Sequence, residues 1–103
     1  MTELEKITEF AKRKNVTFYI RREMLKCGGY KFDQTVFVFR NNYAKSIFPL
    51  LRVSLDTSEY EHRLEQKTLA ESVIWELAAH LADIKAREEF DKDMEFFDTL
   101  KDG

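Results

Sequence analysis

The most constraining feature of this sequence is a long helical pattern that runs from Ser58 to about Arg87. At about 100° per residue, most of its branched apolar residues fall in one stripe roughly 140° wide. This stripe contains Leu69, Ala70, Val73, Ile74, Leu77, Leu81 and Ile84. A second stripe lies roughly opposite and contains Trp75, Ala78, Ala79, Ala82 and Ala86. A helix that covers a sheet with one face does not need the second stripe, so we expect a further surface to bury it.

The chain has 103 residues, of which 44% are apolar, and this is enough for one domain with a hydrophobic core. Its single cysteine excludes an intramolecular disulfide. The first ten residues lack the basic head and apolar run of a secretory signal. No uncharged stretch approaches the roughly 20 residues that a membrane span needs. We therefore expect a soluble, cytoplasmic protein without membrane contact.

Residue periodicity before the long helix predicts one short helix and three strands. Thr2 and Glu5 form a capping-box pattern at the start of the helix. Alternating β-branched and aromatic residues predict the strands, and Gly28-Gly29 marks a turn between the first two. The predicted elements are a helix at residues 2–14 and strands at residues 16–21, 30–40 and 51–55.

The predicted fold class is α+β. A short N-terminal helix is followed by a three-stranded antiparallel sheet and a long helix packed on one sheet face, in the order αβββα. Ser58 and Glu61 repeat the capping-box pattern, so we expect the long helix to begin at Ser58. Within one domain, residues 1–87 form the α+β core and residues 88–103 form an acidic, aromatic helical extension.

The apolar pattern changes phase after Arg87. Phe90, Met94 and Phe97 form a helical stripe, but it lies about 220° from the centre of the first stripe of the long helix. Three arrangements are compatible with this shift. The helix bends near residues 88–91, or the chain turns back as a separate final helix, or this end packs on a second subunit.

Charge is distributed unevenly along the chain. Residues 1–55 carry a net charge of +6 and residues 56–103 carry −8, although the whole chain carries −2. Such asymmetry between halves points to a partner, or to mutual attraction of the two halves inside one fold. The sequence leaves both interpretations open.

A basic patch occupies the N-terminal half, with Tyr19 and Tyr30 among its cations. Because cations neutralise phosphates and aromatic rings stack on bases, this patch is a candidate nucleic-acid surface. The sequence pI of about 5.7 favours other partners over nucleic acid. The patch consists of Lys12, Arg13, Lys14, Arg21, Arg22, Lys26 and Lys31.

The order of one helix, three strands and one helix over residues 2–86 resembles that of the double-stranded-RNA-binding domain. That family places a lysine pair at the start of its second helix to hold phosphates. The corresponding turn here is Ser58-Glu59-Tyr60-Glu61, and Lys67 follows more than two turns later. The resemblance therefore implies a shared architecture, and the phosphate contact of the second helix is not carried over to any residue.

The second stripe of the long helix and the aromatic residues after it form a candidate partner-binding surface. Small residues allow another backbone to approach closely, and a lone tryptophan is a common interface anchor. The alternative is that another helix of the same chain covers the stripe. The candidate residues are Trp75, Ala78, Ala79, Ala82, Ala86, Phe90, Met94 and Phe97.

The C-terminal part is acidic, and its carboxylates have two interpretations. They form an ordinary solvated surface, or they imitate phosphates and dock on a basic, nucleic-acid-binding protein with the nearby aromatic residues as anchors. The candidate acidic patch consists of Glu88, Glu89, Asp91, Asp93, Glu95 and Asp98.

The sequence does not point to an enzyme, a cofactor or a metal site. Glu76, His80 and Asp83 share one helix flank, but they lack the surrounding sequence of known metal-binding helices, so we interpret them as a solvated flank. Cys27 beside two glycines has no imidazole base placed near it by the sequence. We therefore assign no catalytic, cofactor-binding or metal-ligating residue.

These observations predict a non-enzymatic interaction or regulatory protein. We expect it to self-associate, as a homodimer or larger homo-oligomer, or to bind a protein partner. One possible action is inhibition of a nucleic-acid-binding protein through the acidic patch, as a nucleic-acid mimic. The alternative is direct nucleic-acid binding through the basic N-terminal half.

Overall fold

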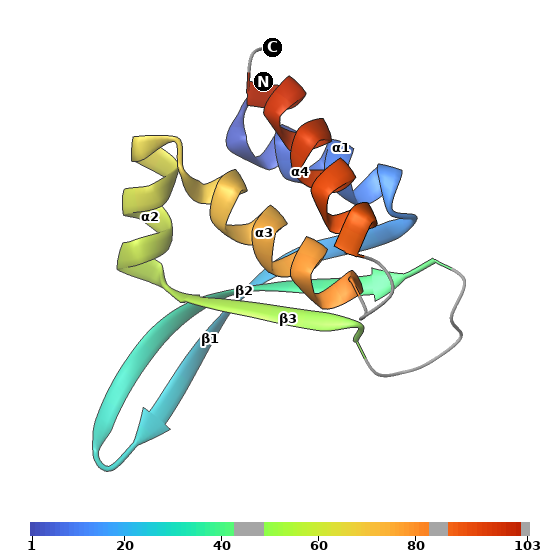
Figure 1. Cartoon of the computed structure of the whole chain (residues 1–103). Helices are drawn as coiled ribbons and strands as arrows, with labels where there is room; N and C mark the ends of the chain where they lie inside the picture. The colour runs from blue at the N-terminus through green and yellow to red at the C-terminus, as the bar shows by residue number, and fades with distance from the viewer. Residues whose placement is uncertain (43–48, 83–86, 102–103) are drawn as a thin grey trace.

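The computed structural model describes residues 1–42, 49–82 and 87–101, apart from the side chains of residues 87–89. Within these residues, four helices and a three-stranded antiparallel sheet form the order α1-β1-β2-β3-α2-α3-α4. The helices lie together on one side of the sheet (Figure 1). This arrangement confirms the predicted α+β fold with its C-terminal helical extension. The elements are α1 (Glu3–Arg13), β1 (Val16–Cys27), β2 (Tyr30–Asn41), β3 (Leu51–Asp56), α2 (Thr57–Gln66), α3 (Leu69–Leu81) and α4 (Arg87–Lys101).

The predicted capping box begins α1. The N–H of Glu5 donates to Thr2 Oγ1 at 3.1 Å, and the N–H of Thr2 donates to Glu5 Oε1 at 3.4 Å. After the helix, Asn15 adopts a left-handed φ of 56°, a conformation that asparagine tolerates. The carbonyl of Asn15 accepts the N–H of Asn42 at 3.1 Å. The turn that ends α1 therefore also ties down the end of β2.

The β1–β2 hairpin is longer than the sequence predicted, because β1 continues past Arg21 to Cys27. Its two-residue turn is Gly28-Gly29, whose φ angles of 56° and 83° are those of a type I′ turn. Within the described residues, β3 pairs with Gln34–Phe39 of β2. The far half of the hairpin therefore extends past the sheet as a two-stranded ribbon (Figure 1).

The hydrophobic core lies between the sheet and the helices. Phe37 and Phe39 of the central strand are fully buried there, together with Ile7 and Phe10 of α1. The Leu and Ile stripe of the predicted long helix completes this core, because Leu69, Ala70, Val73, Ile74 and Leu77 are all fully buried. The prediction that this stripe covers the sheet is confirmed for these five residues. Ile84, the last member of the stripe, lies outside the described residues.

The prediction of one long helix from Ser58 is wrong, because the helix is interrupted at Lys67. Lys67 has a left-handed φ of 61°. Its N–H donates to the carbonyl of Leu64 at 3.3 Å, and the N–H of Thr68 donates to that of Arg63 at 2.9 Å. This pair of hydrogen bonds is a Schellman motif, which ends helices and usually uses glycine. A lysine at this position gave no signal of the break.

The second capping box is also absent from the start of α2 as the structure describes it. The helix begins at Thr57, and its N-cap Asp56 makes no side-chain capping hydrogen bond. The hydroxyl of Thr57 lies 3.1 Å from that of Thr35 on β2, so it joins the helix to the sheet. The strand therefore leads into the helix one residue earlier than Ser58.

The C-terminal residues form a separate helix that folds back on the chain. Helix α4 packs against α3 and α1 (Figure 1). Phe97 and Leu100 are buried in this contact, and Phe90, Met94 and Phe96 are partly buried. Of the three arrangements compatible with the phase shift, the structure shows the one with a separate final helix. Its aromatic residues therefore complete the core of the same chain.

Candidate interaction surface

The far half of the β1–β2 hairpin is the most exposed apolar part of the described structure. We call residues 23–33 the arm, because the pairing of β2 with β3 ends at Gln34. At about 3.4 Å per residue, the four residue pairs beyond Gln34 reach roughly 14 Å past the sheet. Met24, Leu25, Tyr30 and Phe32 are each between 43% and 73% exposed. Large apolar side chains grouped outside a core mark an interaction surface.

The register of the hairpin gives the arm two chemically different faces. Leu25 pairs with Phe32, and Lys26 pairs with Lys31. Paired residues share a face and neighbouring residues alternate between faces. Lys26 and Lys31 therefore lie on the face that continues from Phe37, where the helices pack. Leu25 and Phe32 lie on the opposite face of the sheet.

The lysine pair at the tip of the arm is electrostatically unfavourable. Like charges directly opposite each other on a sheet destabilise it. Nearer the sheet the charges are compensated, because Glu23 accepts from Arg52 at 2.6 Å and from Arg21 at 3.1 Å. Among the described residues, neither Lys26 nor Lys31 has an ion-pair partner. The tip therefore presents uncompensated positive charge on one face and the exposed Leu25 and Phe32 on the other.

Tyr19 lies on the same face as Leu25, above the sheet. A side-chain hydrogen bond with Arg40 is the main cause that lowers the pKa of the Tyr19 phenol from 10.0, and Arg21 adds to it. Tyr19 pairs with Val38 and Arg21 pairs with Val36, and both valines are buried. The long side chains beside the valines cover them by their apolar stems. On this part of the face the valines are therefore covered by charged side chains, whereas farther along the same face Leu25 and Phe32 are exposed.

The structure divides the predicted basic patch into two separate places. Arg21, Arg22, Lys26 and Lys31 lie on the hairpin, where Arg22 is paired with Asp33. Lys12, Arg13 and Lys14 lie at the end of α1. There, Lys14 Nζ is 3.2 Å from Asp93 Oδ2 and Arg13 Nε is 4.0 Å from Asp93 Oδ1. The patch is therefore not one continuous surface.

The predicted acidic patch is also divided. Asp93 is only 3% exposed and faces α1, whereas Asp91, Glu95 and Asp98 face solvent. Lys101 lies 3.7 Å from Asp98. The side chains of Glu88 and Glu89 lie outside the described part of the structure. One acid thus joins the two oppositely charged halves of the chain, as one interpretation of the charge asymmetry expects.

The predicted partner-binding residues occupy a range of environments on α3 and α4. Ala78 and Phe97 are buried within the chain, while Ala79, Ala82, Phe90 and Met94 are partly buried. Ala86 lies outside the described residues. Trp75 is 53% exposed and meets Phe90 edge to face, with ring centroids 6.2 Å apart. Of this set, Trp75 offers the largest free surface.

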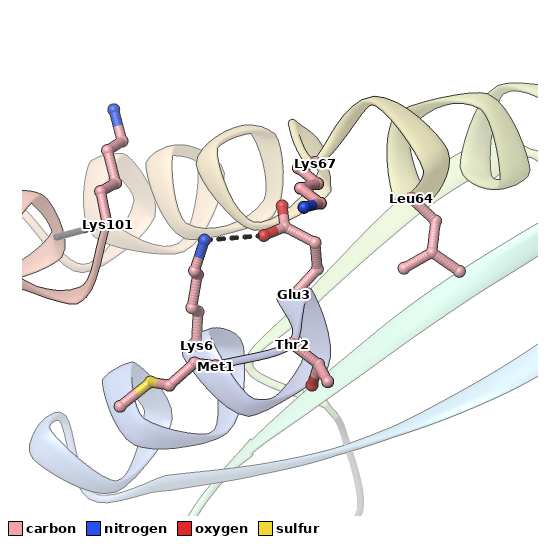
Figure 2. Close-up of a pocket in the computed structure, with 7 residues that line it drawn as sticks. All are labelled: Met1, Thr2, Glu3, Lys6, Leu64, Lys67 and Lys101. Atoms are coloured by element: carbon pink, nitrogen blue, oxygen red, sulfur yellow. Dashed lines mark hydrogen bonds and ion pairs between the residues drawn. The ribbon is translucent and has the colours of Figure 1, made fainter. Parts of the chain in front are cut away.

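A cleft lies between the start of α1, the end of α2 with the turn that follows it, and the end of α4 (Figure 2). Within it, Glu3 Oε2 accepts from Lys6 Nζ at 3.0 Å, and Glu3 Oε1 accepts the N–H of Ala70 at 3.0 Å. Lys101 points away from this pair in Figure 2. Glu3 therefore caps the start of α3, where Thr68 provides no side-chain cap in the described structure. The carboxylate of Glu3 therefore links α1 to the start of α3.

The remaining candidates for chemistry lie apart from one another. Cys27 is exposed at the tip of the arm, His62 lies on α2, and His80 lies near the end of α3. Glu76 and His80 are exposed, and Asp83 lies outside the described residues. Among the residues that the structure describes, no group of three metal-binding side chains occurs. No helix in that part of the chain is long and apolar enough to cross a membrane.

The arm was missed at the sequence level, although a signal for it was present. A two-residue Gly28-Gly29 turn fixes a register in which Cys27 faces Tyr30. In that register a second strand of residues 30–40 requires an equally long first strand. The predicted first strand ends at Arg21, because the charged run after Ile20 interrupts the apolar alternation.

Comparison of the chain with protein-family models, with curated proteins and with solved structures finds no significant match.

Proposed function

We propose that this protein is a non-enzymatic interaction protein that binds another macromolecule through the arm. The observation that supports the proposal is the combination of exposed Met24, Leu25, Tyr30 and Phe32 on a ribbon outside the core. Aromatic residues and methionine are enriched in protein interfaces. A two-stranded ribbon that extends from a rigid sheet presents them to a partner with little loss of conformational freedom.

A capture experiment with matched variants tests this proposal. Immobilised wild type is compared with a Leu25→Ser/Phe32→Ser variant and with Leu64→Ser, which changes another exposed leucine outside the arm. The expected result is that wild type and Leu64→Ser retain a bound macromolecule and the arm variant loses it. Equal melting temperatures would show that all three chains fold. Equal retention by the arm variant would contradict the proposal.

Direct nucleic-acid binding is the second candidate, and the lysine pair at the tip favours it. Lys26 and Lys31 face each other without an ion-pair partner among the described residues, and an approaching phosphate would relieve their repulsion. A two-stranded ribbon also has the width to enter the major groove of a duplex. Fluorescence anisotropy with labelled oligonucleotides tests this candidate. Phosphate binding should weaken steeply between about 50 and 200 mM salt and should be lost in Lys26→Gln/Lys31→Gln.

Regulation through the acidic patch has weaker structural support. A phosphate mimic needs apolar anchors beside its carboxylates. Of the aromatic residues that the sequence offered for this role, Phe97 is buried, and Phe90 and Phe96 are partly buried against the core. The exposed acids on α4 therefore lack these anchors, and the arm provides the better surface for a partner.

A further inference from the structure

Strand β1 forms the longer edge of the described sheet, with 12 residues against 6 in β3. The carbonyl of Asn15 accepts the N–H of Asn42, so the odd-numbered residues of β1 are the ones that bond to β2. The even-numbered residues from Val16 to Lys26 therefore turn their N–H and C=O groups outward. Within the described part of the chain, no strand pairs with this edge. Such a row of backbone groups is a template for another strand.

The side chains of β1 have the same chemical character in both directions from Arg22. On each side, one charged residue is followed by two large apolar residues, and the two charges are opposite in sign. All four apolar residues are at least 36% exposed. The residues are Arg21, Ile20 and Tyr19 on one side and Glu23, Met24 and Leu25 on the other. A strand of this kind is complementary to its own antiparallel copy.

We infer that β1 pairs antiparallel with β1 of a second copy of this chain, with Arg22 on the two-fold axis. Because facing residues share a face of the sheet, a two-fold axis between identical strands must place one residue opposite its own copy. The two sheets then join into one continuous sheet, and every contact is made twice. The inference rests on the proposed function, because residues 23–27 of the paired strand belong to the arm, and it names the partner.

The proposed register pairs the exposed apolar residues of β1 with one another. Ile20 meets Met24 of the second copy on the face where the helices pack, and Tyr19 meets Leu25 on the opposite face. Cross-strand apolar pairs of this kind stabilise a sheet. The same register places outward-pointing backbone groups opposite each other, because the facing residues Ile20 and Met24 both have even numbers. Side chains and backbone therefore favour the same pairing.

The charges of β1 also favour this register. With Arg22 on the axis, Arg21 of each copy faces Glu23 of the other, whereas an axis one residue to either side places charged residues opposite apolar ones. The two Arg22 side chains face each other, but each is paired with Asp33 of its own chain. Glu23 already accepts from Arg21 and Arg52 within its chain, so the second copy extends an existing charge network. The charges therefore fix the register, while the backbone and apolar contacts provide the affinity.

The single cysteine of the chain provides a test of the register. In the proposed dimer Cys27 faces Thr17 of the second copy, so oxidation of a Thr17→Cys variant should join two chains by reciprocal disulfides. Within one chain these positions lie about 34 Å apart along β1, too far for an intramolecular disulfide. Ser54→Cys is the control, because it adds an exposed cysteine on the other edge of the sheet. Cross-linked dimer no more abundant than in this control, on non-reducing electrophoresis, would overturn the inference.

A proline at position 24 tests whether the backbone of this edge makes the contact. The N–H of Met24 points outward, so Met24→Pro removes no hydrogen bond to β2. Met24→Ala removes the same side chain but keeps the N–H. In sedimentation equilibrium, wild type should dimerise at submillimolar concentration, and Met24→Pro should dimerise about tenfold more weakly than Met24→Ala. Equal dimerisation of the two variants would overturn the inference.

The outcomes separate this inference from the proposed function. If wild type sediments as a monomer but the Leu25→Ser/Phe32→Ser variant still loses a captured macromolecule, the dimer is wrong and the arm binds something else. If wild type sediments as a monomer and the arm variant retains every captured macromolecule, both proposals are wrong. Thermal unfolding of each variant shows that loss of binding does not come from loss of the fold.

Discussion

At the scale of single residues, two side chains perform tasks that sequence patterns assign to other residue types. Lys67 occupies the left-handed position of a helix stop, where glycine is usual. Glu3 caps the start of a helix more than sixty positions away in the sequence, in place of a local serine or threonine. Both residues lie beside the same cleft and fix how α3 begins. The direction of α3, and with it the placement of the core, depends on these two residues.

The conformation of Lys67 predicts a stabilising substitution. A left-handed conformation costs a side-chain-bearing residue roughly 1–2 kcal/mol, part of which glycine returns as lost chain entropy. Lys67→Gly should therefore raise the free energy of unfolding by about 0.5–1 kcal/mol. Urea denaturation measures the change. Asn15→Gly is the control, because asparagine already tolerates the left-handed φ at that position. A destabilised Lys67→Gly protein would show that the lysine side chain makes a stabilising contact.

The capping role of Glu3 predicts a loss of stability on neutralisation. Glu3→Gln weakens the hydrogen bond to the N–H of Ala70 and removes the charge that faces Lys6 and the positive end of α3. We expect a loss of about 1–2 kcal/mol, by analogy with helix caps and charge-assisted hydrogen bonds. The control is Glu5→Gln on the exposed side of α1, which should cost less. Equal losses in the two variants would mean that the contact with α3 adds nothing.

At the scale of elements, the sequence predicted those features that depend on repeated spacing. The three strands of the sheet and the buried Leu and Ile stripe are both correct, because burial on a helix or strand repeats with the backbone period. The break at Lys67 could not be predicted, since helical spacing continues through it and the stop contains no glycine. The direction of α4 was left open, because periodicity defines a face but not the element that covers it.

For the candidate surface, helical spacing also identified which residues share a face, but it did not show which of them another element covers. Trp75 was identified from its helical position, and it is exposed. Phe97 was chosen by the same reasoning and is buried, because α4 folds back on α3. The length of β1 in the arm follows from the hairpin register. That the arm extends beyond the sheet does not follow from it. That projection results from the short length of β3, which leaves the end of β2 without a second neighbour in the described sheet.

Removing the arm should separate binding from folding. A deletion of residues 24–27 and 30–33 keeps the Gly28-Gly29 turn and places it between Glu23 and Gln34, which already face each other. None of the deleted side chains belongs to the core, so the change in unfolding free energy should be within about 1 kcal/mol. Circular dichroism during thermal unfolding measures it. Failure of the shortened chain to fold would show that the arm is part of the stable structure.

At the scale of the whole molecule, the uneven charge has two consequences. Part of it is neutralised inside the fold, where Asp93 of α4 meets Arg13 and Lys14 of α1. The rest stays at the surface, positive at the tip of the arm, where Lys26 and Lys31 lie, and negative on the exposed acids of α3 and α4. The internal contact joins the C-terminal helix to α1.

Neutralising Asp93 should loosen the C-terminal helix. Asp93→Asn removes the buried carboxylate that lies 3.2 Å from the ammonium of Lys14, and loss of a buried charge of such a pair costs more than loss of a surface charge. We expect unfolding free energy to fall by about 1–3 kcal/mol in urea denaturation. Asp91→Asn changes the same charge on the exposed side of α4 and should shift it by less than about 0.5 kcal/mol. Similar effects of the two substitutions would contradict a specific role for Asp93.

The two-stranded construction of the arm also determines how its backbone meets solvent. An arm amide that is hydrogen-bonded across the ribbon becomes free to exchange when two strands separate locally, without disturbance of the core. An amide at Phe37, flanked by a strand on each side and covered by helices, becomes free only when the whole fold opens. Deuterium uptake should therefore be fast along the arm and slow at its base, and slower uptake along the arm would directly report its occupation by a partner.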